Sequence, residues 1–253
     1  MGRTSEKKHW DEFWSSSPDM GDVYANDGRV VACLAAHLDL RGARVLEVGA
    51  GTGRDSLELV RRGAEVWTLD YSDESLRVMR AVAGEQMRIV CGDATALPFR
   101  AESFDVVFHQ GLLEHFRDPM SVLRENQRVL VRGGHLLVDV PQRYHYYTLM
   151  KHALMAVNRW FAGWETEFSA RELRGLMEAA GLRVVGQYGA NLFPPVWYRG
   201  ARRTLLKAGV RLPMHPLSSP RLERARASAR ARLPERVRLG TSMVIGCLGR
   251  KPE

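Results

Sequence analysis

The sequence predicts an α/β protein built around a doubly wound, mainly parallel β-sheet. The first observation is the order of patterns between Val45 and Val140, where short apolar runs alternate with helical patterns. The second is a glycine-rich turn between the first apolar run and the next helix, a feature typical of the ligand-binding edge of such a sheet. The third is size, because 253 residues with 45% hydrophobic content can bury the core of one α/β domain with insertions.

The stretch 44–55 predicts a buried strand, a tight turn and the start of a helix. Its apolar residues suit a strand that is covered on both faces. Gly49, Gly51 and Gly53 alternate, so the backbone can turn sharply and approach a ligand closely. The N–H groups that open the helix then point toward that ligand. Arg54 stands where a dinucleotide fingerprint requires its third glycine, so the spacing argues against a dinucleotide.

The other core elements follow in alternation, with a turn at 132–134. We expect helices over 29–40, 54–62, 73–83 and 119–131, and strands over 44–48, 65–69, 87–91, 104–108 and 135–140. Asp70 ends the second strand, 21 residues after Gly49, where an acid meets ribose hydroxyls in nucleotide-binding sheets. The alternative, that Asp70 caps the next helix, is weaker because Ser72 and Asp73 can serve as caps.

Four ordered motifs carry a resemblance to a known family. They are Glu47-x-Gly49-x-Gly51-x-Gly53, Asp70, Gly92-Asp93-Ala94 and Arg128-Val-Leu-Val-Arg-Gly-Gly134. With them the chain resembles the class I S-adenosylmethionine (SAM) dependent methyltransferases, and among these the small-molecule, quinone-biosynthesis-like (type 11) group. The resemblance implies a Rossmann-like sheet of seven strands, with strands 1–5 parallel and the last strand antiparallel. The last two strands are expected at 183–188 and 242–248, with the final one inserted beside the fifth.

The same resemblance implies a SAM site along the strand ends. An acid at the position of Glu47 suits the ammonium group of SAM, and the Asp70 carboxylate can accept from both ribose hydroxyls. In the family, the side chain at Asp93 and the N–H at Ala94 meet the adenine edge. The expected cofactor-binding residues are Glu47, Gly49, Ala50, Gly51, Gly53, Asp70, Tyr71, Asp93, Ala94 and Gln110.

Methyl transfer is an in-line displacement on an activated carbon, so alignment supplies much of the rate. A hydroxyl or phenol acceptor must also lose a proton. His115, just past the fourth strand, is the best candidate base, although a structural histidine is an equal alternative; His145 is a second candidate. Some quinone-pathway O-methyltransferases hold a metal ion through an acid-x-x-acid-His cluster. This chain keeps Glu114-His115 but has Gly111 in place of the first acid, so we expect no metal.

Two segments are candidates for covering the site. Residues 5–14 carry aromatics at near-helical spacing, and in related methyltransferases such a helix often closes over the SAM pocket; packing on the core is an equal alternative. Residues 141–168 are rich in aromatics and Met and follow a strand at the ligand-binding edge, so we favour a helical lid over the acceptor to an insertion packed on the core. We expect one domain over 1–253, with N-terminal cap helices in 1–40, a SAM-binding core over 43–140, the lid over 141–168, and the C-terminal part of the sheet over 169–253 with a basic helical insertion at 190–240.

The net charge of +8 is concentrated in one segment. Residues 190–238 contain twelve Lys and Arg but two Glu, so this segment carries +10 and the rest of the chain −2. In order of preference, the segment is a solvated arginine-rich excursion, a contact with an anionic membrane surface or substrate, or a groove for RNA. Nucleic acid comes last because residues 211–238 lack stacking aromatics between the arginines.

No apolar run approaches the ~18 residues of a membrane span, and the first twelve residues show no signal-peptide core. Cys33, Cys91 and Cys247 are scattered, which argues against disulfides or zinc and for a reducing cytoplasm. We therefore predict a cytoplasmic, or peripherally membrane-bound, SAM-dependent methyltransferase. Its acceptor is expected to be a small apolar or aromatic molecule, methylated on O, C or N. The alternatives are an RNA methyltransferase that uses residues 199–238 and a non-catalytic SAM-binding protein; the oligomeric state stays open.

Overall fold

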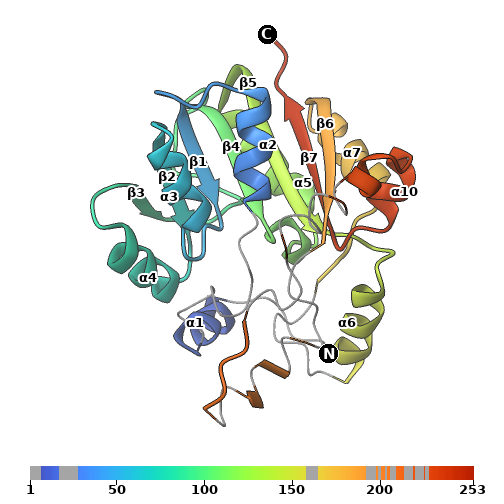
Figure 1. Cartoon of the computed structure of the whole chain (residues 1–253). Helices are drawn as coiled ribbons and strands as arrows, with labels where there is room; N and C mark the ends of the chain where they lie inside the picture. The colour runs from blue at the N-terminus through green and yellow to red at the C-terminus, as the bar shows by residue number, and fades with distance from the viewer. Residues whose placement is uncertain are drawn as a thin grey trace.

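The computed structural model describes residues 7–16, 28–157, 165–191 and 228–253, and isolated positions between 198 and 225. At its centre is a seven-stranded sheet with the strand order β3-β2-β1-β4-β5-β7-β6 (Figure 1). Neighbours from β3 to β5 pair in parallel, and β7 is antiparallel to both β5 and β6, which confirms the predicted sheet. The strands are β1 (Arg44–Val48), β2 (Glu65–Asp70), β3 (Arg88–Cys91), β4 (Phe104–Gln110), β5 (Leu130–Pro141), β6 (Arg183–Ala190) and β7 (Val244–Arg250).

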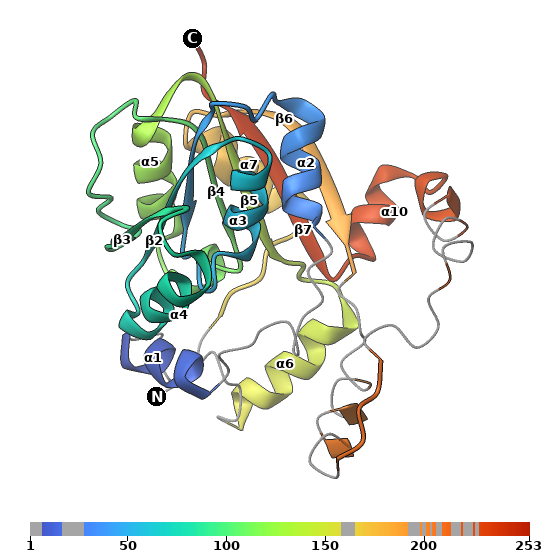
Figure 2. The same ribbon diagram turned by 60° about the vertical axis from the view of Figure 1, so that its left-hand side comes forward.

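Helices cover both faces of this sheet and its ligand-binding edge. One face lies under α2 and α3, and the other under α5 and α7 (Figures 1 and 2). Two further helices, α1 and α6, lie beyond the carboxyl ends of the parallel strands, on the side of the molecule opposite the C-terminus. The helices are α1 (Lys7–Ser16), α2 (Arg29–His37), α3 (Arg54–Arg61), α4 (Asp73–Ala83), α5 (Pro119–Val129), α6 (Tyr146–Ala156), α7 (Ala170–Ala179) and α10 (Glu235–Gly240), with a 3₁₀ turn η2 (Leu113–His115).

The strands are apolar on both faces because helices cover both. In β4, Val106 and Phe108 pack with α2 and α3, whereas Val107 packs with α5 and α7. All three side chains are buried. This alternation is the period of a β-strand, and it explains why the sequence shows continuous apolar runs at these positions.

The structure differs from the sequence prediction at the start of β5. The strand begins at Leu130, and the predicted turn at 132–134 is an irregularity within it: the register with β4 jumps from Leu130 to His135. Gly133 takes the left-handed φ of 74° that this bulge requires. The prediction of a separate turn was therefore wrong, because a Gly pair that ends a helix and one that bulges a strand have the same sequence pattern.

Several expected features lie outside the described residues. They are the connection after Ser16, the lid residues Trp160, Phe161 and Trp164, and Trp197, Arg199, Arg203, Lys207, Arg221, Arg224 and Arg226 of the basic segment. In the part of the chain that the structure describes, no helix is long and apolar enough to cross a membrane.

Candidate active site

A cavity of about 540 Å³ lies at the carboxyl ends of the parallel strands. Its wall is built from the ends of β1, β2, β4 and β5, from the turn after β3, from the start of β7 and from α1. In open α/β sheets this edge is the place where ligands bind. The sheet order brings together strand ends that are far apart in sequence.

The glycine turn after β1 shapes one wall of this cavity. Gly49 and Gly51 have left-handed φ angles of 67° and 55°. A Cβ on Gly51 would lie 2.7 Å from the ring of Trp14, and one on Gly49 would lie 2.7 Å from the side chain of Leu112. Both positions therefore need glycine for conformation and for space. Gly53 caps α3 from the left-handed region and does not line the cavity, so its observed role is to shape the turn.

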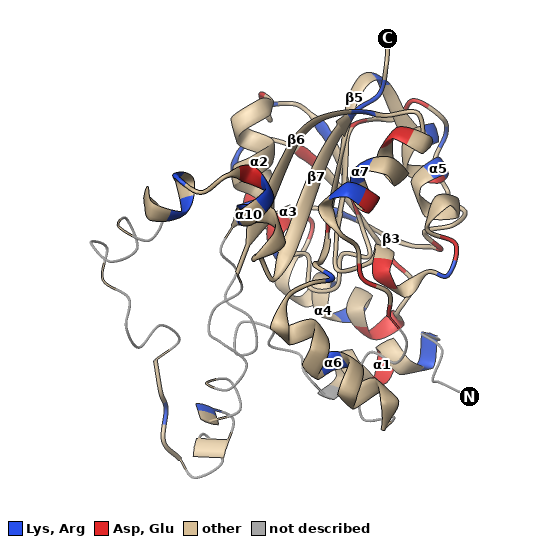
Figure 3. Ribbon diagram, turned by 90° about the vertical axis from the view of Figure 1, so that its right-hand side faces the viewer, with Lys and Arg blue, Asp and Glu red and all other residues tan. Residues whose placement is uncertain are grey.

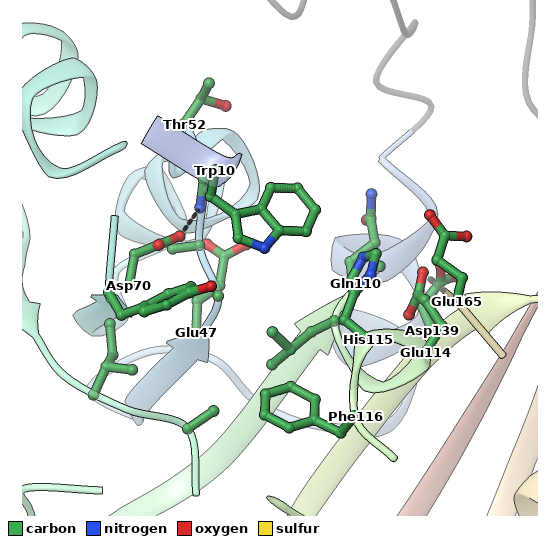
Figure 4. Close-up of a pocket in the computed structure, with 18 of the residues that line it drawn as sticks. Trp10, Glu47, Thr52, Asp70, Gln110, Glu114, His115, Phe116, Asp139 and Glu165 are labelled. Atoms are coloured by element: carbon green, nitrogen blue, oxygen red, sulfur yellow. Dashed lines mark hydrogen bonds between the residues drawn. The ribbon is translucent and has the colours of Figure 1, made fainter. Parts of the chain in front are cut away.

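Asp70 fixes the glycine turn against the end of β2. Its carboxylate accepts hydrogen bonds from the N–H of Gly51 at 2.9 Å and from the N–H of Ser72 at 3.0 Å (Figure 4). Burial raises the pKa of this carboxyl group, and the backbone donors oppose that rise. Ser72 is the residue that caps α4, since its hydroxyl accepts from the N–H of Ser75. Asp70 is thus free of the capping role and lines the cavity.

Glu47 supplies a second buried carboxyl group. It accepts a hydrogen bond from the Ser56 hydroxyl at 2.5 Å. Burial, followed by the nearby Asp55 carboxylate, raises the pKa of Glu47 to about 8. A buried acid in an acidic wall is stabilised by an incoming cation, so this end of the cavity suits a ligand with an ammonium group.

The structure brings together most of the predicted cofactor-binding residues. Nine of the ten line the cavity: Glu47, Gly49, Ala50, Gly51, Asp70, Tyr71, Asp93, Ala94 and Gln110. Asp93 also accepts from the N–H and the hydroxyl of Thr95, both at 2.8 Å, which fixes the turn after β3. Their role toward the cofactor stays a prediction.

Helix α1 covers this part of the cavity. Trp10, Phe13 and Trp14 line it. The helix is held to α4, because Asp11 accepts from the Ser72 hydroxyl at 2.6 Å and Lys7 pairs with Asp73 at 2.6 Å. The aromatic face of α1 therefore contacts the cavity, as expected for a helix that closes over a bound ligand. In contrast, α2, the second predicted cap helix, packs on the sheet with Val30, Val31 and Leu34.

The two candidate bases lie in different surroundings. His115 ends η2 and lines the cavity, with its ring edge-on to Trp10 at 4.8 Å between centroids. His145 does not line the cavity. It caps α6 by accepting from the N–H of Tyr147 at 3.3 Å, and burial lowers its pKa. The geometry therefore favours His115 over His145 as the base, and this assignment stays a prediction.

Comparison with known proteins agrees with this geometry. Residues 46–138 match the family model described as a methyltransferase domain. The chain is 31% identical over 164 residues to a ubiquinone biosynthesis O-methyltransferase of Ruegeria sp. (strain TM1040), an alignment that covers 62% of this chain and 66% of that protein. This chain carries a SAM-dependent methyltransferase domain.

Other proteins that resemble this chain are also methyltransferases by name. A rice protein, 2-methyl-6-phytyl-1,4-hydroquinone methyltransferase 1, is 32% identical over 71% of this chain and 52% of its own length. The chain thus spans about two thirds or less of the length of these two relatives. A Thermotoga maritima SAM-dependent methyltransferase has the same fold (TM-score 0.64, 20% identity, 97% of this chain and 100% of that one). So does the Burkholderia thailandensis 1,6-didemethyltoxoflavin-N1-methyltransferase, solved with S-adenosylhomocysteine (TM-score 0.60, 21% identity, 96% and 87%). The predicted family is confirmed.

An ion-paired group at the β5 end of the cavity was not predicted from the sequence. Arg29 donates two hydrogen bonds of 2.9 Å to the Asp139 carboxylate. The Tyr188 hydroxyl donates a third to Asp139 at 2.7 Å. Burial and the Asp139 charge raise the pKa of Tyr188, so it stays a neutral donor. These residues are 110 and 49 positions from Asp139 in sequence, and no local pattern could have paired them.

A second missed group joins the lid to the site. The ammonium of Lys151 on α6 lies 2.7 Å from a carboxylate oxygen of Glu165 and 2.6 Å from one of Glu167. Burial alone would lower the pKa of Lys151, but the two carboxylates outweigh it and raise that pKa. A lone lysine in the apolar stretch 146–156 was the available signal, since a buried lysine needs an acidic partner.

The predicted lid is a helix over Tyr146–Ala156, and Tyr147 lines the cavity from it. Glu165 lines the cavity as well. Among the described residues, no group of three or more His, Cys, Asp or Glu side chains is arranged to hold a metal ion. The Glu114 carboxylate lies 3.6 Å from the place where a Cβ on Gly111 would be, so the two positions of the metal-binding pattern are adjacent here.

Proposed function

We propose that this chain transfers the methyl group of SAM to a small, apolar or aromatic molecule bound beneath α6. The observation that carries the proposal is the extent of the cavity, which reaches from Asp70 on β2 to Asp139 on β5. Three strand spacings separate these strands, or about 14 Å, which leaves room for two ligands side by side. The relatives named above, which include ubiquinone and hydroquinone methyltransferases, support an acceptor of this class.

The residues present fit SAM at the β2 side of the cavity. Gly49 and Gly51 hold the turn in its left-handed conformation beside the cavity, and the raised pKa of Glu47 marks a carboxyl group that gains from a cationic neighbour. In this proposal Asp70 accepts from the ribose hydroxyls, Glu47 holds the ammonium group, and Asp93 and Ala94 meet the adenine edge. Bound SAM would supply an activated methyl group on a sulfonium.

The acceptor then occupies the other half, between η2 and the end of β5. Leu112, His115 and Phe116 come from the β4 side, and Tyr147 comes from α6. These apolar and aromatic side chains suit a ligand with an apolar body. Helices α1 and α6 cover the two halves and limit the access of water to the reacting groups.

The proposal is tested by incubating the purified chain with isotopically labelled SAM and small-molecule extracts, followed by mass spectrometry. Products that gain the labelled methyl group support it, and Asp70→Ala should lower their yield. Binding of SAM without turnover on any extract would favour the non-catalytic alternative and refute the proposed reaction.

We further propose an anionic membrane surface as a docking partner of the lid side. Tyr144, Tyr146, Leu149 and Val157 are exposed, with Leu149 74% accessible. Lys and Arg recur along the described parts of residues 198–240 (Figure 3). Aromatic, apolar and basic side chains together suit the interface of anionic lipids. The cytoplasmic location stays a prediction from the unpaired cysteines.

Sedimentation with anionic and with neutral vesicles, in low and high salt, tests this docking. We expect the chain to sediment with anionic vesicles at low salt, and Leu149→Ser to weaken the association. Absence of association at low salt would refute the membrane partner and leave the methyl transfer proposal untouched.

A further inference from the structure

Three carboxyl groups meet at the β5 end of the cavity. Glu114 comes from η2, Asp139 from the end of β5, and Glu165 from the chain that follows the lid helix (Figure 4). All three are buried and line the cavity. They come from three separate segments, so the fold rather than a local motif places them together.

Two of these carboxyl groups have cationic partners. Asp139 is held by the guanidinium of Arg29 and by the Tyr188 hydroxyl. Glu165 is paired with the ammonium of Lys151. Glu114 differs from both, because its buried Oε2 has no hydrogen-bond partner among the described residues. A buried oxygen without a partner costs about 1–3 kcal/mol, so its presence in a cavity wall points to a ligand that satisfies it.

The charges around Glu114 indicate which kind of ligand this is. Burial, followed by the nearby Glu165 carboxylate, raises the pKa of Glu114 well above its usual value. Asp139 adds to this rise, and Lys151 opposes it. The carboxylate form of Glu114 accepts from a hydroxyl or an ammonium group, and an ammonium group also offsets the charge of the neighbouring acids, whereas a carboxylate would add to it.

The ligand in question is the acceptor rather than SAM. Glu47 and Asp70 lie at the ends of β1 and β2. Glu114 instead follows β4 and precedes His115 in η2, on the other side of β1 from β2. Figure 4 shows the same separation, with Asp70 and Glu47 on one side of the Trp10 ring and Glu114, Asp139 and Glu165 together on the other.

We propose that Glu114 binds a hydrogen-bond donor of the acceptor, a hydroxyl or an ammonium group, and takes its proton during methyl transfer. For a hydroxyl, the O–H bond breaks and its proton moves to the Glu114 carboxylate, while the oxygen lone pair forms the new C–O bond and the C–S bond breaks. The sulfur keeps the electron pair as a neutral thioether. For an ammonium group, the proton moves first, and the neutral amine then forms the C–N bond. This inference rests on the proposed function and deepens it by naming the acceptor chemistry.

The test uses the full chain saturated with S-adenosylhomocysteine and three small probes of similar shape: phenol, benzylamine and toluene. Calorimetry or NMR titration measures the affinity of each probe for the natural chain and for Glu114→Gln and Glu114→Leu. Glu85→Leu is the matched control, because Glu85 is exposed and lies away from the cavity. Circular dichroism establishes that each variant folds, and Glu114→Gln, which keeps the shape, serves if Glu114→Leu does not.

We expect phenol or benzylamine to bind about tenfold or more tightly than toluene, as for a hydrogen bond to a charged or acidic group. Glu114→Leu should abolish this preference, and Glu85→Leu should preserve it. Preference for phenol assigns a hydroxyl acceptor, and preference for benzylamine an ammonium acceptor.

Equal affinity for the three probes, no binding of either donor, or an unchanged preference in the Glu114 variants would overturn the inference. A loss of more than about tenfold in the affinity of Glu114→Gln for S-adenosylhomocysteine would also overturn it, because a loss of that size would place Glu114 in the SAM site. Failure of the natural chain to bind S-adenosylhomocysteine at all would instead refute the proposed function on which the inference rests.

Discussion

Replacing Asp70 with alanine separates the two duties that the structure gives this carboxylate. Its oxygens hold the glycine turn through the N–H groups of Gly51 and Ser72, at 2.9 Å and 3.0 Å. Its cavity side is free to accept from the ribose of SAM. The variant therefore loses internal hydrogen bonds and ligand hydrogen bonds at once, and two different measurements report on them.

The expected sizes follow from these contacts. Hydrogen bonds from a ligand to a charged group contribute about 1.5–3 kcal/mol, so the affinity for S-adenosylhomocysteine should fall about tenfold to a hundredfold. Each buried N–H that loses its partner costs about 1–3 kcal/mol of unfolding free energy. The second effect is present with or without ligand.

Calorimetric titration with S-adenosylhomocysteine and urea unfolding are the assays. Asp105→Ala is the matched control. Asp105 pairs with Arg44 at 3.0 Å, lies near the start of β4, at the opposite end of the strands from the cavity, and does not line the cavity. The control should lose about 1 kcal/mol or less through this partly exposed pair and keep its affinity. If Asp70→Ala binds as tightly as the natural chain, Asp70 does not contact the cofactor.

Three further predictions address the turn, the buried acid and the lid. Burial raises the pKa of Glu47 from 4.5 to about 8. Between these values the folded chain holds a proton that the unfolded chain has lost, so the unfolding free energy falls as pH rises across this range. Glu47→Gln should remove that part of the slope in urea unfolding at a series of pH values; an identical slope in both chains contradicts the buried, protonated acid. Gly51→Ala should cost about 1–2 kcal/mol in thermal unfolding, since φ is 55° and the new Cβ would meet Trp14. The same variant should weaken cofactor binding, and unchanged stability and affinity would show that the turn tolerates a side chain. Lys151→Met should cost about 3–5 kcal/mol in urea unfolding, because it leaves buried carboxylates unpaired. Adding Glu165→Leu should recover part of this loss, and a loss below about 1 kcal/mol would contradict the buried pair.

The sequence predicted the elements whose signals are local. The strand at Arg44–Val48 and the helix at Asp73–Ala83 have the expected bounds, because an apolar run before a glycine turn and a serine cap before an amphipathic stretch act on adjacent residues. Ser169 likewise forms a capping box with Glu172, three residues further along the chain. Each of these signals involves neighbours that interact within one or two turns.

The parts that were missed depend on long-range pairing. Arg29 lies before the first strand, and its partner Asp139 lies near the end of β5, so only the closed sheet brings them together. Glu114 was known from its motif, but its surroundings were not, since burial and the Glu165 carboxylate, 51 positions further along the chain, raise its pKa. The proposed SAM site is thus formed by motifs that follow one another along the sequence. The proposed acceptor site is formed by residues that are far apart in the sequence.

Titration of the full chain with S-adenosylhomocysteine by calorimetry is the decisive experiment for the donor site at the end of β1 and β2. We expect saturable binding at a single site, weakened by Asp70→Ala and preserved in Asp105→Ala. Absence of binding to the folded chain would contradict the assignment of this cavity to SAM, and with it the methyl transfer proposed for the protein.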